Sequence, residues 1–301
     1  MRAGTGLLAA SRALARRSIR GHGRIADLGR RLIADRYLRV PYLDTGSIWV
    51  CPGHTSGEDV HRTGIYEPQV IRAIQSFVRA GFSFVDVGAN IGLHTVAAGM
   101  SRVSESQRFA AFEPEPRSFL LLRKNCDANG LSFVETLPAA VGSAEGTAEL
   151  YVSTTFNQTH HGLVRHSTQV TVARCEVTTL DREFSTGPRR LDTPTLVKID
   201  VEGTEPEVLR GGLYWLSESK PLAVICELSP VLLRRAGHTP QTVMDLLREI
   251  GCDRFLATDD NSPDPWRGFE LPALGEMRRS FVNLLATRGL EARRLSEELT
   301  V

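Results

Sequence analysis

The stretch FVDVGANIGLHTVAAG, which begins at Phe84, contains the first residues whose types and spacing suggest ligand binding. An apolar run ends at Asp86, and Gly88, Asn90 and Gly92 follow before a helix-like run begins. Glycine adopts any backbone φ and lets a ligand lie against the main chain, and asparagine tolerates the left-handed region better than most residues. The spacing does not match the G-x-G-x-x-G pattern of dinucleotide sites. An acid two residues before the first glycine favours a ligand with a positive group.

A second acid, Glu113, ends the next strand-like run, FAAFEP. A carboxylate at the tip of that strand can accept hydrogen bonds from both hydroxyls of a ribose. S-adenosylmethionine has an ammonium group and a ribose but no phosphate, so we interpret the glycine turn and the two acids as a site for it. The alternative is a tight strand-to-helix turn with a capping acid.

The segment VKIDVEG supplies candidates for the chemistry. Lys198, Asp200 and Glu202 share one face if this strand runs straight. An unpaired ammonium in mid-strand is costly, so we expect Lys198 to pair with acids on the flanking strand tips, Asp86 and Glu227. Methyl transfer to a hydroxyl needs an oriented nucleophile and a base within reach. We predict that Asp200 is this base and that Lys198 and Glu227 set its charge environment; the alternative is a structural ion pair.

Histidines form a second set of candidates, because only histidine titrates near neutral pH when unperturbed. The segment TFNQTHHGLVRHS would be either a lid over the acceptor with a histidine base or a solvated loop. Its candidates are Asn157, His160, His161 and His166. Adjacent residues point apart in an extended chain, so the two neighbouring histidines do not predict a metal site. His94, just after the glycine turn, would either pack or border the acceptor.

Alternating strand-like and helix-like segments must position these residues. EPQVIRAIQSFVRAG has helical spacing of its apolar residues and a natural stop at Gly81. Residues 24–40 are predicted to be helical, and residues 42–66 to form short strands and turns. FVETLPAAVG is predicted to be one strand. Strands that alternate with helices indicate an α/β fold with a mostly parallel sheet. The last two strands, RFLATD and SFVNLLATR, are joined by a loop and suit an antiparallel hairpin at the sheet edge.

The chain has 301 residues, 42% of which are hydrophobic, and its acidic and basic residues nearly balance at a formal net charge of +1. This balance gives no electrostatic footprint for duplex nucleic acid. Five scattered cysteines without metal-ligand spacing suggest buried thiols in a reducing compartment. No apolar run approaches the length of a membrane span. Residues 1–26 hold six arginines and no acid, which indicates either a solvated terminus or a targeting or membrane-surface segment.

Several blocks, in order and with their spacing kept, resemble the FkbM family of S-adenosylmethionine-dependent methyltransferases. They are GIYEP, FVDVGANIGLHTVAAG, FAAFEPEPRSFLLLRKNCDANG, LPAAVGSAEGTAEL, TTLD and LVKIDVEGTEPEVLRG, which together cover about residues 64–230. The resemblance implies a Rossmann-like seven-stranded sheet, mostly parallel with an antiparallel last strand, and O-methylation of sugar, polyketide or related hydroxyls.

By position, the resemblance also assigns site residues. Asp86, Gly88, Asn90 and Gly92 would line the methionine moiety, Glu113 would hold the ribose, and Ala140 and Val141 would flank the adenine. We expect an N-terminal extension over residues 1–64, a methyltransferase domain over 65–290 and a C-terminal tail over 291–301.

These observations predict a cytoplasmic methyltransferase that acts on a hydroxyl of a small molecule or glycan. The chain lacks an (N/D/S)-PP-(Y/F) block after Asp200, which argues with the neutral charge against a nucleic-acid substrate. The arginine-rich start would suit peripheral membrane contact. The alternatives are a nucleoside-binding protein without catalysis and an NAD-dependent oxidoreductase, the latter disfavoured by the missing G-x-G-x-x-G pattern.

Overall fold

The computed structural model describes residues 37–51, 55–153, 161–163, 169–186, 188–218, 221–259, 264–270 and 281–301. The basic segment 1–26 and residues 24–36 of the predicted first helix lie outside this range. The chain divides into two compact units. One contains the described residues up to Tyr66 together with Ser153, and the other contains Glu67–Val152 and His161–Val301.

The first unit is a β-hairpin followed by a helix. Strands β1 (Leu38–Tyr42) and β2 (Gly46–Val50) pair in antiparallel register, and α3 (Thr55–Thr63) follows. Alternation along β1 buries Val40 and Tyr42, so the prediction that a helix continues to residue 40 is wrong at its end. Residues 55–63 are helical where only short strands and turns were predicted.

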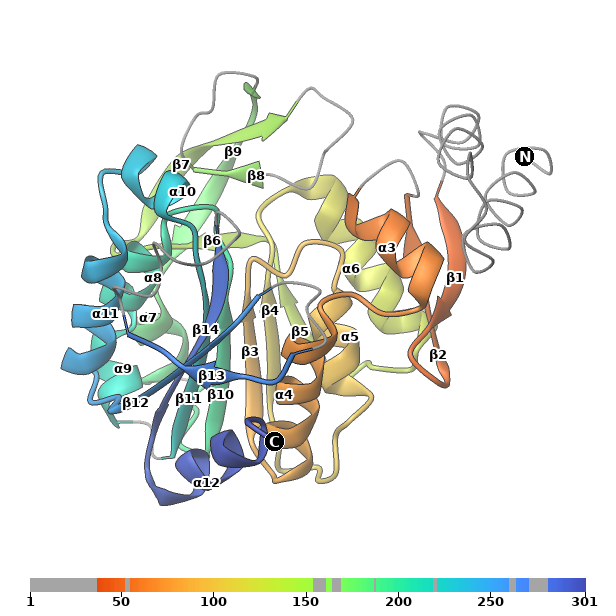
Figure 1. The fold of residues 1–301 in the computed structure, drawn as a ribbon. Helices are drawn as coiled ribbons and strands as arrows, with labels where there is room; N and C mark the ends of the chain where they lie inside the picture. Colours follow the sequence, from red (N-terminus) through yellow and green to blue (C-terminus); the bar gives the residue numbers. More distant parts are fainter. Residues whose placement is uncertain are drawn as a thin grey trace, which may run out of the picture. The chain divides into compact units, whose positions relative to one another are not determined.

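Eight strands of the described residues form the main sheet of the second unit (Figure 1). From edge to edge they are β13 (Arg267–Gly268), β12 (Arg254–Thr258), β14 (Val282–Arg288), β11 (Leu222–Leu228), β10 (Thr195–Ile199), β3 (Ser83–Val87), β4 (Phe109–Phe112) and β5 (Val134–Leu137). Strands β11, β10, β3, β4 and β5 are parallel, and β14 is antiparallel to both of its neighbours. The Rossmann-like α/β fold with an antiparallel last strand is confirmed, but the main sheet has eight strands in the described part of the chain and not the expected seven, because the two-residue β13 pairs with β12 at the edge.

The C-terminal strand lies inside the sheet and not at its edge. The predicted antiparallel pairing of the last two long strands is correct, since β12 pairs with β14. The pair lies at one end of the sheet, with β14 beside β11, β12 outside it and the two-residue β13 at the edge itself. Leu284 and Ala286 of β14 are buried in the core, and this burial stabilises the inserted position.

Helices cover both faces of the main sheet (Figure 1). One face carries α4 (Pro68–Arg79), α5 (Leu93–Gly99), α6 (Pro116–Ala128) and α12 (Leu290–Glu298). The other carries α7 (Leu180–Phe184), α8 (Glu205–Gly211), α9 (Leu213–Glu218) and α11 (Pro240–Glu249), while α10 (Pro230–Arg235) follows β11. The apolar stripe predicted for α4 is buried, as are Ala292 and Leu295 of α12. The residues set apart as a C-terminal tail are therefore mostly a packed helix.

The central strands β3 and β10 are buried along their whole length. Val85, Val87, Val197 and Ile199 belong to the core cluster beneath α7, α8, α9 and α11. Because side chains alternate across a strand, the intervening residues of β3 and β10 point to the opposite face. Two of these residues are charged, and they begin the candidate site.

A second, smaller sheet has the order β6-β9-β7-β8. Its strands are β6 (Ala139–Val141), β9 (Gln169–Thr178), β7 (Gly146–Ser153) and β8 (His161–Gly162). The single strand predicted over FVETLPAAVG is thus wrong, because the chain passes from β5 in the main sheet to β6 in the smaller one at Pro138. Proline lacks the N–H that a continuous ladder would need.

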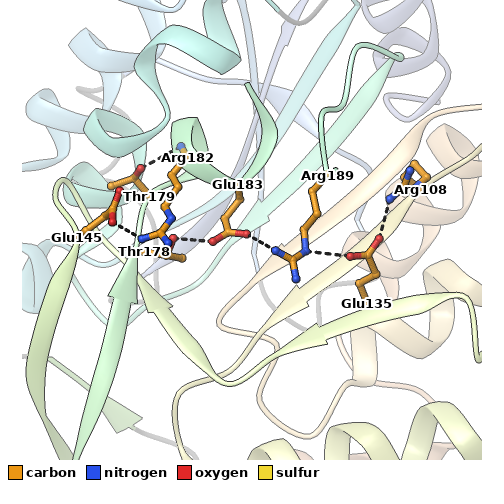
Figure 2. Close-up of polar contacts among 8 residues, drawn as sticks. All are labelled: Arg108, Glu135, Glu145, Thr178, Thr179, Arg182, Glu183 and Arg189. Atoms are coloured by element: carbon orange, nitrogen blue, oxygen red, sulfur yellow. Dashed lines mark hydrogen bonds and ion pairs between the residues drawn. The ribbon is translucent and has the colours of Figure 1, made fainter. Parts of the chain in front are cut away.

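A chain of polar contacts runs from the start of β4 to β9 (Figure 2). Glu135 of β5 accepts from Arg108 at 2.7 Å and from Arg189 at 2.9 Å. Arg189 also contacts Glu183 of α7 at 2.9 Å, and Glu183 accepts from Thr178 of β9 at 2.7 Å. The arginines are 41–47% exposed, so each pair contributes little by itself, and the network mainly fixes α7 against the two sheets.

All five cysteines are buried, as the sequence predicts. Within the described residues, no helix is long and apolar enough to span a membrane.

Candidate functional site

The glycine turn after β3 has the backbone that its sequence predicts. Gly88, Asn90 and Gly92 all have positive φ, at 82°, 51° and 87°. A Cβ on Gly88 would lie 1.9 Å from the carbonyl oxygen of Asp200, so glycine is required where the turn meets the end of β10. The side chain of Asn125 on α6 donates to Ile91 O at 2.8 Å and holds the turn from outside.

Glu113 lies directly beside this turn. One carboxylate oxygen accepts the N–H of Asn90 at 2.7 Å, and the other accepts the N–H of Glu115 at 2.7 Å. Burial raises the pKa of Glu113 to about 8, against the two backbone hydrogen bonds, which lower it. Each oxygen of a carboxylate can accept two hydrogen bonds, so Glu113 keeps acceptor capacity on both oxygens while it orders the turn.

Asp86, at the end of β3, is fully buried. Its Oδ2 accepts from the hydroxyl of Thr95 on α5 at 2.6 Å. Its Oδ1 is also buried and has no hydrogen-bond partner among the described residues. A buried carboxylate oxygen without a partner is costly, and such a group is common where a ligand completes the site.

Lys198 and Asp200 form the centre of the candidate site. Lys198 Nζ lies 2.9 Å from Asp200 Oδ2, and the two side chains are 2% and 31% exposed. Burial lowers the pKa of Lys198, but Asp200, Asp86 and Glu67 more than offset it and raise the pKa above its ordinary range. The ion-pair partner of Lys198 is therefore Asp200, and the expected direct pairing with Asp86 and Glu227 is wrong. Asp86 is the register neighbour of Lys198 in β3.

Glu227, at the end of β11, hydrogen-bonds to Asp200. Burial and the charge of Asp200 hold the pKa of Glu227 well above its usual range, so it stays protonated and donates. Burial raises the pKa of Asp200, but Lys198 and Glu227 outweigh this effect and lower it to about 2. The two carboxyl groups thus share one proton, with the negative charge on Asp200.

The turn after β10 contains a residue that the sequence analysis missed. The strand ends at Ile199, and Glu202 has a left-handed backbone with φ of 58°, so the alternation does not extend to Glu202 as expected. Oε1 of Glu205, the first residue of α8, accepts the N–H groups of Val201 and Gly203 at 3.2 and 3.0 Å. Burial raises the pKa of Glu205 to about 7, against these hydrogen bonds. Its position two residues after Gly203 and directly before Pro206 was the available signal.

Glu67, a second residue that the sequence analysis missed, lies beside His94, for which packing and bordering the acceptor were both left open. His94 Nε2 on α5 lies 3.1 Å from Glu67 Oε2, and both side chains are 7% exposed. Burial, with a contribution from the nearby Lys198, lowers the pKa of His94 to about 3, so the ring is neutral. His94 therefore packs inside the site. The available signal was the acid in GIYEP, just before the proline that begins α4.

Of the remaining predicted residues, two are in β6, where their role beside the adenine stays a prediction, and the others belong to the histidine-rich segment. Ala140 packs with Leu150 and Cys175 in the core of the smaller sheet, and Val141 packs in the main core. His161 is in β8. Asn157, His160 and His166 lie outside the described residues.

Together, the residues at the carboxyl ends of β3, β4 and β10 fit a nucleoside that carries a positive group. Asp86 offers a buried oxygen without a partner, Gly88 exposes main chain, and Glu113 keeps acceptor capacity on both oxygens. These are the groups that S-adenosylmethionine requires, and the adjoining Asp200 is the partly exposed member of the cluster.

The comparisons with known proteins place the chain. Residues 86–253, more than half of the chain, match the family described as the Methyltransferase FkbM domain. Methyltransferase 1 of Beauveria bassiana (strain ARSEF 2860) is 29% identical over 149 residues, which cover 42% of this chain and 57% of that protein. This chain thus spans less than two thirds of the length of that relative.

Solved structures show more distant likenesses. An FkbM methyltransferase from Methylobacillus flagellatus KT is 18% identical, with a TM-score of 0.41, over 76% of this chain and 52% of that one. A tRNA (uracil-54, C5)-methyltransferase from Pyrococcus abyssi, in complex with S-adenosyl-L-homocysteine, is 13% identical, with a TM-score of 0.43, over 83% of this chain and 44% of that one.

Proposed function

This chain belongs to the FkbM methyltransferase family, and we propose that it methylates a hydroxyl oxygen of a small-molecule or saccharide acceptor. Methyl transfer with S-adenosylmethionine as donor follows from the family. The choice of oxygen and the class of acceptor are the proposal. When bound, S-adenosylmethionine supplies an electrophilic methyl group on a positively charged sulfur.

The residues around the glycine turn would hold this cofactor. The free oxygen of Asp86 suits an ammonium group, and Glu113 suits the two ribose hydroxyls. The main chain from Gly88 to Gly92 would line the methionine part. These residues bind and orient, and their contribution to rate is the geometry that they impose.

The exposure of Asp200 beside the buried Lys198 is the observation that carries the proposal of a hydroxyl acceptor. Its side chain is 31% exposed, whereas its partner Lys198 is 2% exposed, so Asp200 is the member of the pair that a substrate can reach. An ionised carboxylate accepts a hydrogen bond from an O–H group and so orients a lone pair of that oxygen. Because its pKa is about 2, Asp200 is a weak base. Its contribution is to orient the acceptor hydroxyl and to stabilise the proton of that hydroxyl, which becomes more acidic as the methyl group is transferred.

Lys198 and Glu227 hold Asp200 in place from two sides. The ammonium fixes one oxygen at 2.9 Å, and the protonated Glu227 donates to the same carboxylate. A carboxylate held by two partners keeps its position when the acceptor binds, which is what methyl transfer requires.

The test is methyl transfer from labelled S-adenosylmethionine to components of an extract of the source organism. We expect a labelled product whose methyl group is bound to oxygen. Asp200→Asn, assayed in single turnover, should lower the rate by about 10²–10³-fold with little change in cofactor affinity. Asp192→Asn, at an exposed position, is the control. A product methylated at nitrogen or carbon, or near-normal turnover by Asp200→Asn, would overturn the proposal.

A further inference from the structure

The carboxyl groups around Lys198 outnumber the buried cations. In the described part of the chain, Lys198 is the only buried lysine or arginine side chain. Asp200 contacts its ammonium directly, and Asp86 and Glu67 both act on it as negative charges. His94 adds no positive charge, because burial keeps it neutral. One cation therefore faces three carboxyl groups.

An independent observation indicates that a ligand completes this cluster. Asp86 is fully buried, and its Oδ1 has no hydrogen-bond partner among the described residues. Asp86 lies two residues before Gly88, on the strand that leads into the cofactor turn, and it is the register neighbour of Lys198. The cluster and the cofactor site therefore adjoin.

Glu67 is held in this cluster by a strained backbone. It occupies the position before α4 with φ of 44° and ψ of 67°, in the left-handed region that residues other than glycine avoid. An acid at this position commonly caps the helix, but the side chain of Glu67 makes no such hydrogen bond. It lies instead 3.1 Å from His94, buried on α5. Strain of this kind persists where the surroundings impose it, often at functional sites.

We propose that Glu67 is a specificity-determining residue that makes the site prefer cationic S-adenosylmethionine to its neutral product, S-adenosylhomocysteine. Both ligands have the same ammonium and carboxylate groups, so they differ only by the methyl group and the charge on sulfur. Transfer breaks the S–CH₃ bond, leaves its electron pair on sulfur and forms a C–O bond, while the hydroxyl proton leaves to water. The excess negative charge attracts the donor and loses this attraction once the product forms. The proposal rests on the cofactor assigned above.

Isothermal titration calorimetry with three ligands tests this preference. They are S-adenosylmethionine, S-adenosylhomocysteine and sinefungin, which carries an amine in place of the sulfonium. We expect the wild-type protein to bind the two cationic ligands roughly 3- to 30-fold more tightly than S-adenosylhomocysteine. Glu67→Gln should reduce this ratio at least about threefold and leave the Kd of S-adenosylhomocysteine within about twofold. That Kd also reports a folded site.

The matched control is Glu135→Gln, which removes an exposed carboxylate from the Arg108 and Arg189 pairs. It should leave the ratio unchanged, and Glu67→Asp should restore most of the preference. A wild-type protein that binds S-adenosylhomocysteine as tightly as S-adenosylmethionine would overturn the inference, whatever the variants do. Equal weakening of all ligands by Glu67→Gln would overturn it too, by making Glu67 merely structural. Binding of none of the three would instead refute the cofactor assignment.

Discussion

Glu113 has two roles at the scale of the residue, because its carboxylate orders the glycine turn and faces the expected ribose. Both of its oxygens accept backbone N–H groups, from Asn90 and Glu115. A neutral amide at this place would accept one of these hydrogen bonds and set its own NH₂ against the other donor. The substitution Glu113→Gln therefore disturbs ligand binding and the local backbone together.

We predict that above pH 8, where Glu113 is ionised, Glu113→Gln weakens binding of S-adenosylmethionine by about tenfold or more, since charge-assisted hydrogen bonds contribute about 1.5–3 kcal/mol each. Calorimetry on the variant measures this change. The control is Glu115→Gln, whose side chain caps α6 by accepting the N–H of Ser118 at 2.6 Å. It should alter stability but leave the affinity within about twofold. Equal affinity of wild type and Glu113→Gln would remove Glu113 from the ribose site.

The sequence predicted the left-handed backbone of Gly88, Asn90 and Gly92, because their spacing is local and belongs to one turn. It did not predict the partner of Lys198, since Asp86 beside it and Asp200 two residues beyond it are equally compatible with a straight strand. Only the geometry at the end of β10 selects Asp200. Glu67 and His94 were not assigned for a related reason: their contact depends on how α4 meets α5, which no local pattern encodes.

At the scale of the element, the turn from β10 to α8 depends on close contact with α10. Gly203 has φ of +105°, and a Cβ there would lie 2.6 Å from the carbonyl oxygen of Leu232. Gly130 also has positive φ, at +70°, but a Cβ there would meet nothing within 4 Å. Alanine substitutions at these two glycines therefore distinguish the cost of backbone strain alone from the added cost of a steric clash.

We predict that Gly130→Ala costs about 1–2 kcal/mol of unfolding free energy, from the left-handed backbone alone. Gly203→Ala should cost roughly 1–3 kcal/mol more, because neighbouring backbone must also move. Urea denaturation of both variants gives the comparison. Equal losses would mean that the contact between Gly203 and α10 is looser than these distances indicate.

Periodicity predicted the alternating strands and helices, including the whole apolar face of α4. The periodicity of apolar residues was not informative where one pattern is compatible with two arrangements of the same strands. The C-terminal hairpin could join the sheet through either of its strands, and the apolar run of β14, buried from Val282 to Thr287, does not by itself show that β14 is the strand beside β11. The passage from β5 to the smaller sheet was missed because both strands have strand-like composition, although Pro138 lies between them.

At the scale of the whole molecule, buried carboxyl groups link folding to pH. Burial raises the pKa of Glu113 to about 8 and that of Glu205 to about 7, from an ordinary value of 4.5. Between the ordinary and raised values, the folded protein binds more protons than the unfolded chain, so stability falls as pH rises. His94 acts in the opposite sense, but only below its ordinary value of 6.5.

We therefore predict that the unfolding free energy of the cofactor-free protein falls between pH 6.5 and pH 8. Each carboxyl group contributes about 1.4 kcal/mol per pH unit while it is protonated only in the folded state. Chemical denaturation at several pH values measures the slope, and Glu113→Gln should flatten it up to about pH 8 and Glu205→Gln up to about pH 7. A stability that stays constant or rises over this range would show that these groups are ionised in the folded protein.

The inserted position of β14 has a consequence for how the chain folds while it is being synthesised. Every residue placed in the candidate site, up to Glu227, precedes β14 in the chain, yet β12 reaches the rest of the main sheet through β14. A nascent chain that ends before Val282 therefore leaves β11 with an unpaired edge and β12 without its main partner. Because domains begin to fold during synthesis, the ligand-binding half can form on the ribosome while the exposed edge of β11 awaits the final segment.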